Sequence, residues 1–108
     1  MSVPLAKPVA AYFRANAAFD VDGMLAPFAE DAVVIDEGRA HRGRAEIRAW
    51  IEEATIGNRA LAAPQEAAAS GTTERVTAEI TGAFPGSPIT LGFRFTLAGD
   101  RIARLEIR

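Results

Sequence analysis

Residues 74–84 read ERVTAEITGAF, and residues 88–97 read PITLGFRFTL. Apolar and polar side chains alternate in both stretches, so every second residue can face a core while its neighbours face solvent. This period of two is typical of antiparallel strands with one buried face. Pro85-Gly86 lies between the stretches and favours a turn, so the two together predict a β-hairpin.

The flanking sequence extends this sheet in both directions. Gly99-Asp100 is a turn signal after the hairpin, and an Ala-rich segment before it has weak strand character. Nearer the N-terminus, branched residues lead into the turn signal Asp36-Glu37-Gly38, which predicts a further hairpin. The predicted strands are 32–36, 39–42, 59–70, 74–84, 88–97 and 101–107.

Three segments have the period of amphipathic helices. The first, 4–18, must begin near its two prolines, because proline is tolerated only in the first turn of a helix. Asp20 is suited to cap a short second helix, 21–29, which Pro27 should bend or shorten. The third helix is predicted over 44–56, where apolar residues recur at i, i+3, i+4 and i+7 before Gly57 ends the pattern.

Helices combined with a one-sided sheet indicate the α+β class, in which the helices pack on the apolar face of the sheet. With 108 residues, the chain has the size of a single domain, 1–108. A long sheet must twist. We therefore predict a cone-shaped, curved antiparallel (mixed) β-sheet that wraps around three N-terminal helices and encloses an apolar pocket.

The composition restricts the classes of function. The chain is 49% hydrophobic with a formal net charge of −2, so charge gives no reason to expect nucleic acid or a membrane as partner. It has no cysteine and one histidine, and we expect neither a metal site nor a cofactor. No apolar run has the length of a membrane span and no secretion signal is evident, so a cytoplasmic protein is expected.

Three phrases carry a family resemblance: FDVDG at 19–23, FAEDAVVID at 28–36 and RGRAEI at 42–47. Together with the order of the later strands, they resemble the nuclear transport factor 2-like superfamily. That group includes ketosteroid isomerases and SnoaL-like polyketide cyclases. The resemblance covers almost the whole chain and implies the cone-shaped fold, which hosts enzymes, carriers and interaction modules alike.

The resemblance to ketosteroid isomerases implies two catalytic residues. Asp36 occupies the position of their proton-shuttling carboxylate, and Tyr12 that of the phenol that donates to the developing oxyanion. Leu91 occupies the position of their second donor, a protonated aspartic acid, so one of the two oxyanion donors is missing. The residues also allow simpler interpretations, with Asp36 as a solvent-exposed turn residue and Tyr12 as a core aromatic.

Chemistry supports a pocket position for Asp36, which shares its strand face with Ala32 and Val34. Hydrocarbon solvates an ionised carboxylate poorly, and this favours a base that works near neutral pH. His41 either assists proton transfer, orients a ligand or lies on the surface. Aromatic and aliphatic side chains wall most ligand pockets. The predicted ligand-binding residues are Phe13, Phe28, Val34, His41, Trp50, Phe84, Leu91 and Phe93.

Two functions of different classes remain open at this point. In the first, the pocket binds a small, mostly apolar carbonyl compound, and Asp36 transfers a proton during isomerisation or cyclisation while Tyr12 polarises the oxygen. In the second, the same fold is a non-catalytic ligand-binding or dimerisation module. Relatives of this fold commonly pair through the outer face of the sheet, so a homodimer is also expected.

Overall fold

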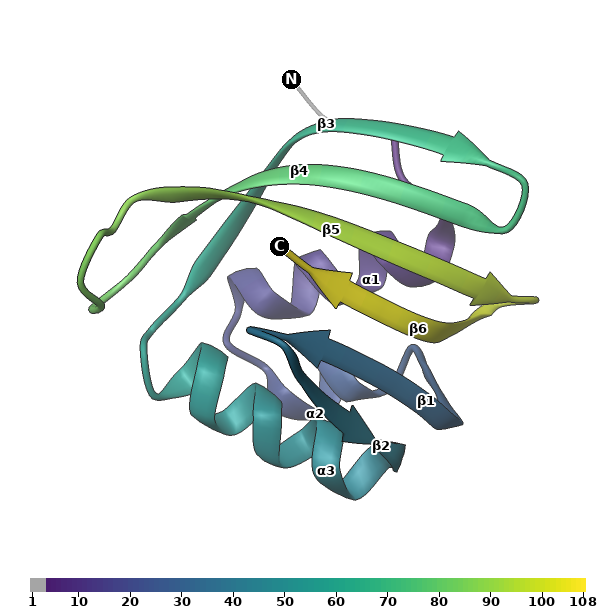
Figure 1. The fold of residues 1–108 in the computed structure, drawn as a ribbon, viewed down its shortest axis with the longest axis horizontal. Coiled ribbons are helices and arrows are strands. Elements are labelled where there is room, and N and C mark those ends of the chain that lie inside the picture. Colours follow the sequence, from purple (N-terminus) through teal and green to yellow (C-terminus); the bar gives the residue numbers. More distant parts are fainter. Residues whose placement is uncertain (1–3) are drawn as a thin grey trace.

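The computed structural model describes residues 4–108 and consists of helices on one side of a single curved sheet (Figure 1). The last helix continues directly into a stretch of π-helix, η1, so that the two form one continuous rod. The helical elements are α1 (Lys7–Ala17), α2 (Val21–Leu25), α3 (Gly43–Trp50) and η1 (Ile51–Ile56).

The sheet has six strands in the order β2-β1-β6-β5-β4-β3. Strands β1 and β6 are parallel and every other pair of neighbours is antiparallel, so the sheet is mixed. It curls over the helices without closing into a barrel (Figure 1). The strands are β1 (Phe28–Asp36), β2 (Arg39–Arg42), β3 (Leu61–Ser70), β4 (Thr73–Thr81), β5 (Ile89–Ala98) and β6 (Arg101–Ile107). The predicted α+β fold is confirmed.

The alternation in the two best strands sets which face of the sheet is buried. Val76, Ala78 and Ile80 of β4 are buried, as are Phe93 and Phe95 of β5. These side chains face the helices, whose own apolar stripes complete the core. The largest fully buried side chains come from both layers: Val9, Met24, Phe28, Val34, Ile47, Ile51, Val76, Phe95, Ile102 and Leu105.

The first hairpin turns within two residues, as predicted. Glu37 and Gly38 both have positive φ, 53° and 75°, which is the backbone of a type I′ turn and matches the twist of the flanking strands. Asp36 is therefore the last residue of β1, and it pairs with Arg39 of β2. The turn leaves Asp36 anchored in the sheet rather than in the loop.

The second helix is shorter than predicted, and the strand after it begins earlier. Asp20 caps α2 as expected, because its side chain accepts a hydrogen bond from Gly23 N at 3.0 Å. The helix nevertheless ends at Leu25, not at residue 29. Pro27 offers no N–H to continue it, and its carbonyl instead accepts from Ile102 N at 2.8 Å. The chain thus joins the sheet at Phe28, four residues before the predicted start.

Two polar side chains attach α1 to the sheet. The helix begins at Lys7, later than predicted, and Glu74 of β4 accepts from Ala6 N at its start. Near its end, Asn16 donates to Ala60 O at 3.0 Å and accepts from Ala62 N at 2.7 Å. Both side chains are buried. They fix the helix across the concave face at each of its ends.

Strand β4 ends at Thr81 rather than at residue 84. Gly82 N donates to the hydroxyl of Ser87 at 3.0 Å, and Ala83 N donates to Asn58 O at 2.7 Å. These hydrogen bonds replace the strand ladder. They bring the β4–β5 loop against the end of η1, where the cavity described below opens.

Candidate functional site

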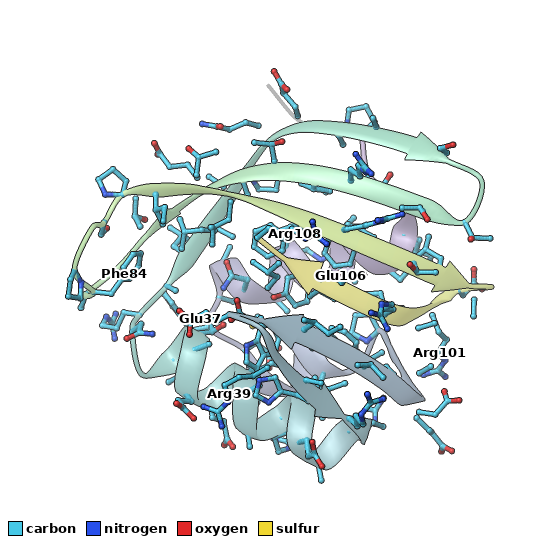
Figure 2. All side chains as sticks on the ribbon, in the orientation of Figure 1. Glu37, Arg39, Phe84, Arg101, Glu106 and Arg108 are labelled. Carbon is cyan, nitrogen blue, oxygen red and sulfur yellow. The ribbon has the colours of Figure 1, made fainter. Side chains whose placement is uncertain are left out.

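A cavity of about 660 Å³ lies between the β1–β2 hairpin, η1 and the β4–β5 loop. Figure 2 shows Phe84 on the β4–β5 loop at one side, with Glu37 and Arg39 at the β1–β2 turn on the other. The lining residues are Asp36, Glu37, Arg39, His41, Trp50, Glu53, Ala54, Asn58, Ala60, Ile80, Phe84, Pro85, Ile89, Leu91, Ile107 and Arg108.

Exposure divides this lining into an outer rim and an interior. Most charged residues of the lining are exposed and form the rim. The rim residues are Glu37, Arg39, Glu53, Asn58, Pro85, Ile89 and Arg108. The other lining residues are buried or half-buried, and all of them are apolar or aromatic except Asp36 and His41. An apolar interior with few polar groups is the usual composition of a small-molecule site.

The interior carboxylate is held by a hydrogen bond from a helix. Trp50 Nε1, at the end of α3, donates to Asp36 Oδ2 at 3.0 Å. Within residues 4–108, the other carboxylate oxygen accepts no hydrogen bond from the protein. Asp36 is therefore fixed at one oxygen and open to the cavity's contents at the other.

His41 lies on the same face of the hairpin as Asp36. It pairs with Val34 in the β1–β2 ladder, two residues along from the Asp36–Arg39 pair, so all four side chains share one face. The imidazole centre is 6.1 Å from that of the Trp50 ring at a tilt of 35°. The hairpin and helix thus bring the three side chains Asp36, His41 and Trp50 together.

Tyr12 lies in the core next to this group. Its ring makes edge-on contacts with Phe13, Phe28 and Phe95, at centroid distances of 5.2, 5.9 and 5.6 Å. Burial, and then the negative charge of Asp36, raise the pKa of Tyr12 well above its ordinary value. The phenol consequently keeps its proton across the physiological pH range and can only act as a neutral hydrogen-bond donor or acceptor.

The comparisons with known proteins agree with this architecture. The sequence profile of the SnoaL-like domain matches residues 9–105. The chain belongs to the SnoaL-like domain family. A solved protein from Sinorhizobium meliloti that carries the provisional name polyketide cyclase is 42% identical. It is similar over 96% of this chain and 95% of its own length, with a TM-score of 0.92.

More distant structures share the fold of this SnoaL-like domain. A hypothetical protein from Catenulispora acidiphila, described as ketosteroid isomerase-like in fold and bound to trimethylamine, is 19% identical with a TM-score of 0.82. That similarity covers 99% of this chain and 86% of the other. A nuclear transport factor 2-like protein of unknown function from Cytophaga hutchinsonii is 12% identical over 100% of this chain and 93% of its own, with a TM-score of 0.81. No curated protein matches the chain. The predicted superfamily is confirmed.

The structure divides the predicted site residues of the SnoaL-like domain into two groups. One group lines the cavity: Asp36, His41, Trp50, Phe84 and Leu91. The other group is buried in the core and does not line the cavity: Tyr12, Phe13, Phe28, Val34 and Phe93. Leu91 and Phe93 face the same side of β5, but Phe93 packs on Phe13 of α1 at 5.4 Å between ring centroids. The division follows where α1 covers the sheet.

Several lining residues were not predicted. Ile80 shares the inward face of β4 with Val76 and Ala78. In β6, Ile107 lies two residues after the buried Leu105 and so on the same face, and alternation alone could have indicated both lining residues. The charged rim residues carry no such signal, because their position depends on how three separate elements meet. The hydrogen bond from Trp50 to Asp36 likewise joins residues 14 positions apart on different elements.

Within residues 4–108, no helix is long and apolar enough to cross a membrane. The same residues include no group of three or more histidine and acidic side chains placed to hold a metal ion. A cytoplasmic location stays a prediction from the sequence.

Proposed function

We propose that this SnoaL-like domain binds a small, mostly apolar carbonyl compound in its cavity and transfers a proton with Asp36. The observation that carries this proposal is the placement of Asp36, a carboxylate in the less exposed, apolar part of the cavity wall with one oxygen free of protein hydrogen bonds. A general base must reach its substrate's proton while shielded from bulk water. The name polyketide cyclase on a relative with 42% identity is consistent with carbonyl chemistry.

The proposed reaction begins with an ionised Asp36 and a carbonyl compound that has an acidic α-hydrogen. The C–H bond breaks, its proton passes to Asp36, and the electron pair moves to the carbonyl oxygen of the enolate. Tyr12 is the donor that the family resemblance assigns to this oxygen. It stays protonated and lies near Asp36 but behind the cavity lining, so the carbonyl end of the ligand has to reach past the lining residues to accept its hydrogen bond. Asp36 then returns the proton to the same or another carbon. In a cyclisation, the enolate carbon instead attacks a second carbonyl of the ligand, and the alkoxide that forms there takes the proton back from Asp36.

A non-catalytic carrier of the same ligand is the second candidate. Leu91 lies at the position where the ketosteroid isomerases have their second oxyanion donor. Here this position contributes only a hydrocarbon side chain to the cavity lining. Loss of one such donor typically costs about 10²–10³ in rate. A site with Tyr12 as its single oxyanion donor should bind an apolar ketone as tightly as a site with two donors, but should convert it to the enolate slowly. Binding with little or no enolisation is the result expected of a carrier.

Deuterium exchange into a simple ketone separates these candidates and does not require the natural substrate. An enolisable bicyclic ketone such as 2-tetralone is incubated in D₂O with the protein, and loss of the α-hydrogen signal is followed by NMR. We expect Asp36→Asn to reduce the enzymatic exchange rate by about 10²–10⁴-fold, the usual contribution of a general base. Quenching of Trp50, the only tryptophan, measures ketone binding in the same samples.

The matched control is Glu53→Gln, which removes a carboxylate from the exposed rim of the same cavity. It should retain the exchange rate within about twofold, because the exposed rim carboxylate is solvated and its charge is screened by salt. Binding without exchange in the wild-type protein would identify a carrier. Equal loss of exchange in both variants would show that cavity charge, and not the position of Asp36, supports the reaction.

We further propose that two copies pair through the outer face of the sheet. Arg75 and Arg94 lie directly opposite each other on β4 and β5, an unfavourable pair of like charges. On its other side Arg94 lies opposite Glu106 of β6, but that carboxylate is ion-paired with Arg104 and Arg108, and neither Arg75 nor Arg94 is ion-paired within residues 4–108. Glu66 and Glu79 belong to the same outer face, opposite Thr77 and Thr90. A two-fold related copy can bring these acids against the arginines.

Light scattering at tens of micromolar tests this pairing, for which we expect twice the chain mass. Arg94→Glu should shift the equilibrium toward monomer, because it places an acid among the acids of the partner. Arg101→Glu, at the first residue of β6 (Figure 2), is the control and should leave the mass unchanged. A monomer of the unmodified protein at these concentrations would rule the pairing out.

A further inference from the structure

We propose that Trp50 is a positioning residue for Asp36, which fixes one carboxylate oxygen and leaves the other to exchange protons with the ligand. This inference rests on the proposed proton transfer. It adds that Trp50 orients the base, Asp36, and it identifies which of the two carboxylate oxygens takes the proton. The sequence alone indicates only that Trp50 lines the pocket. The structure gives its indole a directional role as well.

The hydrogen bond itself supplies the first part of the argument. Trp50 Nε1 donates to Asp36 Oδ2 at 3.0 Å, an ordinary length for an N–H···O bond. An indole has one N–H and no acceptor, so Trp50 can only donate here. Because a carboxylate with one oxygen engaged has lost most of its freedom to rotate, the lone pairs of Oδ1 keep a fixed direction. Oδ1 is the atom that takes the proton from the ligand.

The donor is in turn held rigidly. Trp50 is 6% exposed and lies where α3 continues into η1, and its neighbours Ile47 and Ile51 are completely buried. Helix packing thus sets the backbone of Trp50. On the hairpin side, the ring of His41 lies beside the indole at 6.1 Å between centres. The indole is thus supported from the helix and from the hairpin, two of the elements that border the cavity.

Fixed orientation matters because proton transfer depends steeply on geometry. A displacement of about 1 Å in a reacting group can cost about 10²-fold in rate. Asp36 is the last residue before a two-residue turn, and its carboxylate has no other hydrogen-bond partner within residues 4–108. Without the indole N–H, the side chain is expected to sample several rotamers, only some of which face the ligand.

The hydrogen bond can be tested without any substrate. Trp50 is the only tryptophan, so the protein has a single indole N–H resonance in NMR. We expect Asp36→Ala to move this resonance upfield and to speed its exchange with water, whereas Glu53→Gln on the rim leaves it in place. An indole resonance that is indifferent to Asp36→Ala would overturn the inference, whatever the activity of the protein.

Ketone exchange kinetics test the positioning role. Trp50→Phe keeps an aromatic ring and removes the N–H, and we expect kcat to fall by about 10- to 100-fold while KM changes by less than about threefold. Trp50→Ala also removes the wall of the cavity, so its KM should rise as well. Melting curves of both variants separate this effect from unfolding.

A double-mutant cycle distinguishes positioning from a general structural effect. If Trp50 acts through Asp36, then Trp50→Phe should cause no further loss of exchange in the Asp36→Asn background. A similar loss in both backgrounds, or a wild-type kcat for Trp50→Phe alone, would refute the positioning role and leave the function of Asp36 intact. If the unmodified protein catalyses no exchange, the proposed function fails and this inference fails with it.

Discussion

Replacing Asn16 with alanine is expected to lower the free energy of unfolding by about 2–4 kcal/mol. The Asn16 amide donates to Ala60 O and accepts from Ala62 N, and the side chain is 3% exposed. Alanine removes both hydrogen bonds and leaves a backbone acceptor and a backbone donor unpaired near the core, each of which costs about 1–3 kcal/mol. The contact also joins α1 to the start of β3, two elements far apart in the sequence.

Chemical denaturation followed by circular dichroism measures this effect, and Asn58→Ala provides the control. The Asn58 amide makes one exposed hydrogen bond, from its Nδ2 to Ala54 O at 3.1 Å. Its loss should cost less than about 1 kcal/mol, because water replaces the partner. Equal destabilisation by the two variants would mean that Asn16 does no more than an ordinary surface amide, and that α1 is held by its apolar face alone.

The alternation of apolar side chains was enough to predict the two strands β4 and β5 and which of their faces is buried. It depends only on local chemistry, since successive side chains of a strand point to opposite faces whatever lies beyond them. The hairpin at Glu37-Gly38 was equally local. Helix ends were less predictable, because Pro27 pairs through its carbonyl with Ile102, which lies at the other end of the chain.

The sequence identified several residues of the candidate site but not how they are arranged around the cavity. Asp36 was singled out by its place at the end of an apolar strand and by the family resemblance, and it does line the cavity. The alternation of β5 also put Leu91 and Phe93 on one face. It could not show that Phe93 is covered by Phe13 of α1 while Leu91 faces the cavity, since that depends on where a distant helix crosses the sheet.

Hydrogen bonds between elements escaped sequence reasoning altogether. The sequence indicated Trp50 only as a residue of the pocket wall, whereas in the structure its indole N–H donates to Asp36. Glu74 shares the inward face of β4 with Val76, and its carboxylate accepts from Ala6 N at the start of α1, a partner that the strand's own sequence does not indicate. In each case the tertiary packing of a helix against the sheet decides which polar groups meet.

Alkaline pH should destabilise the protein through Tyr12, the only tyrosine in the chain. Burial and the charge of Asp36 raise the pKa of Tyr12 in the folded state above its ordinary value of 10.0. Below about pH 10 the phenol is protonated in both states, so this group adds no pH dependence there. Above that pH the unfolded chain loses the proton while the folded protein keeps it, and the free energy of unfolding falls as pH rises toward the folded-state pKa.

The slope of this loss approaches about 1.4 kcal/mol for each pH unit above the ordinary value. Between pH 9 and pH 11, denaturation curves of the unmodified protein should therefore lose about 1.4 kcal/mol more than those of Tyr12→Phe, which keeps the aromatic packing but cannot ionise. Tyrosinate absorbance gives a second measurement, because only Tyr12 contributes: it should appear together with unfolding. Absorbance that rises near pH 10 while the protein is still folded would show that the phenol is solvated, and would remove it as a protected donor beside Asp36.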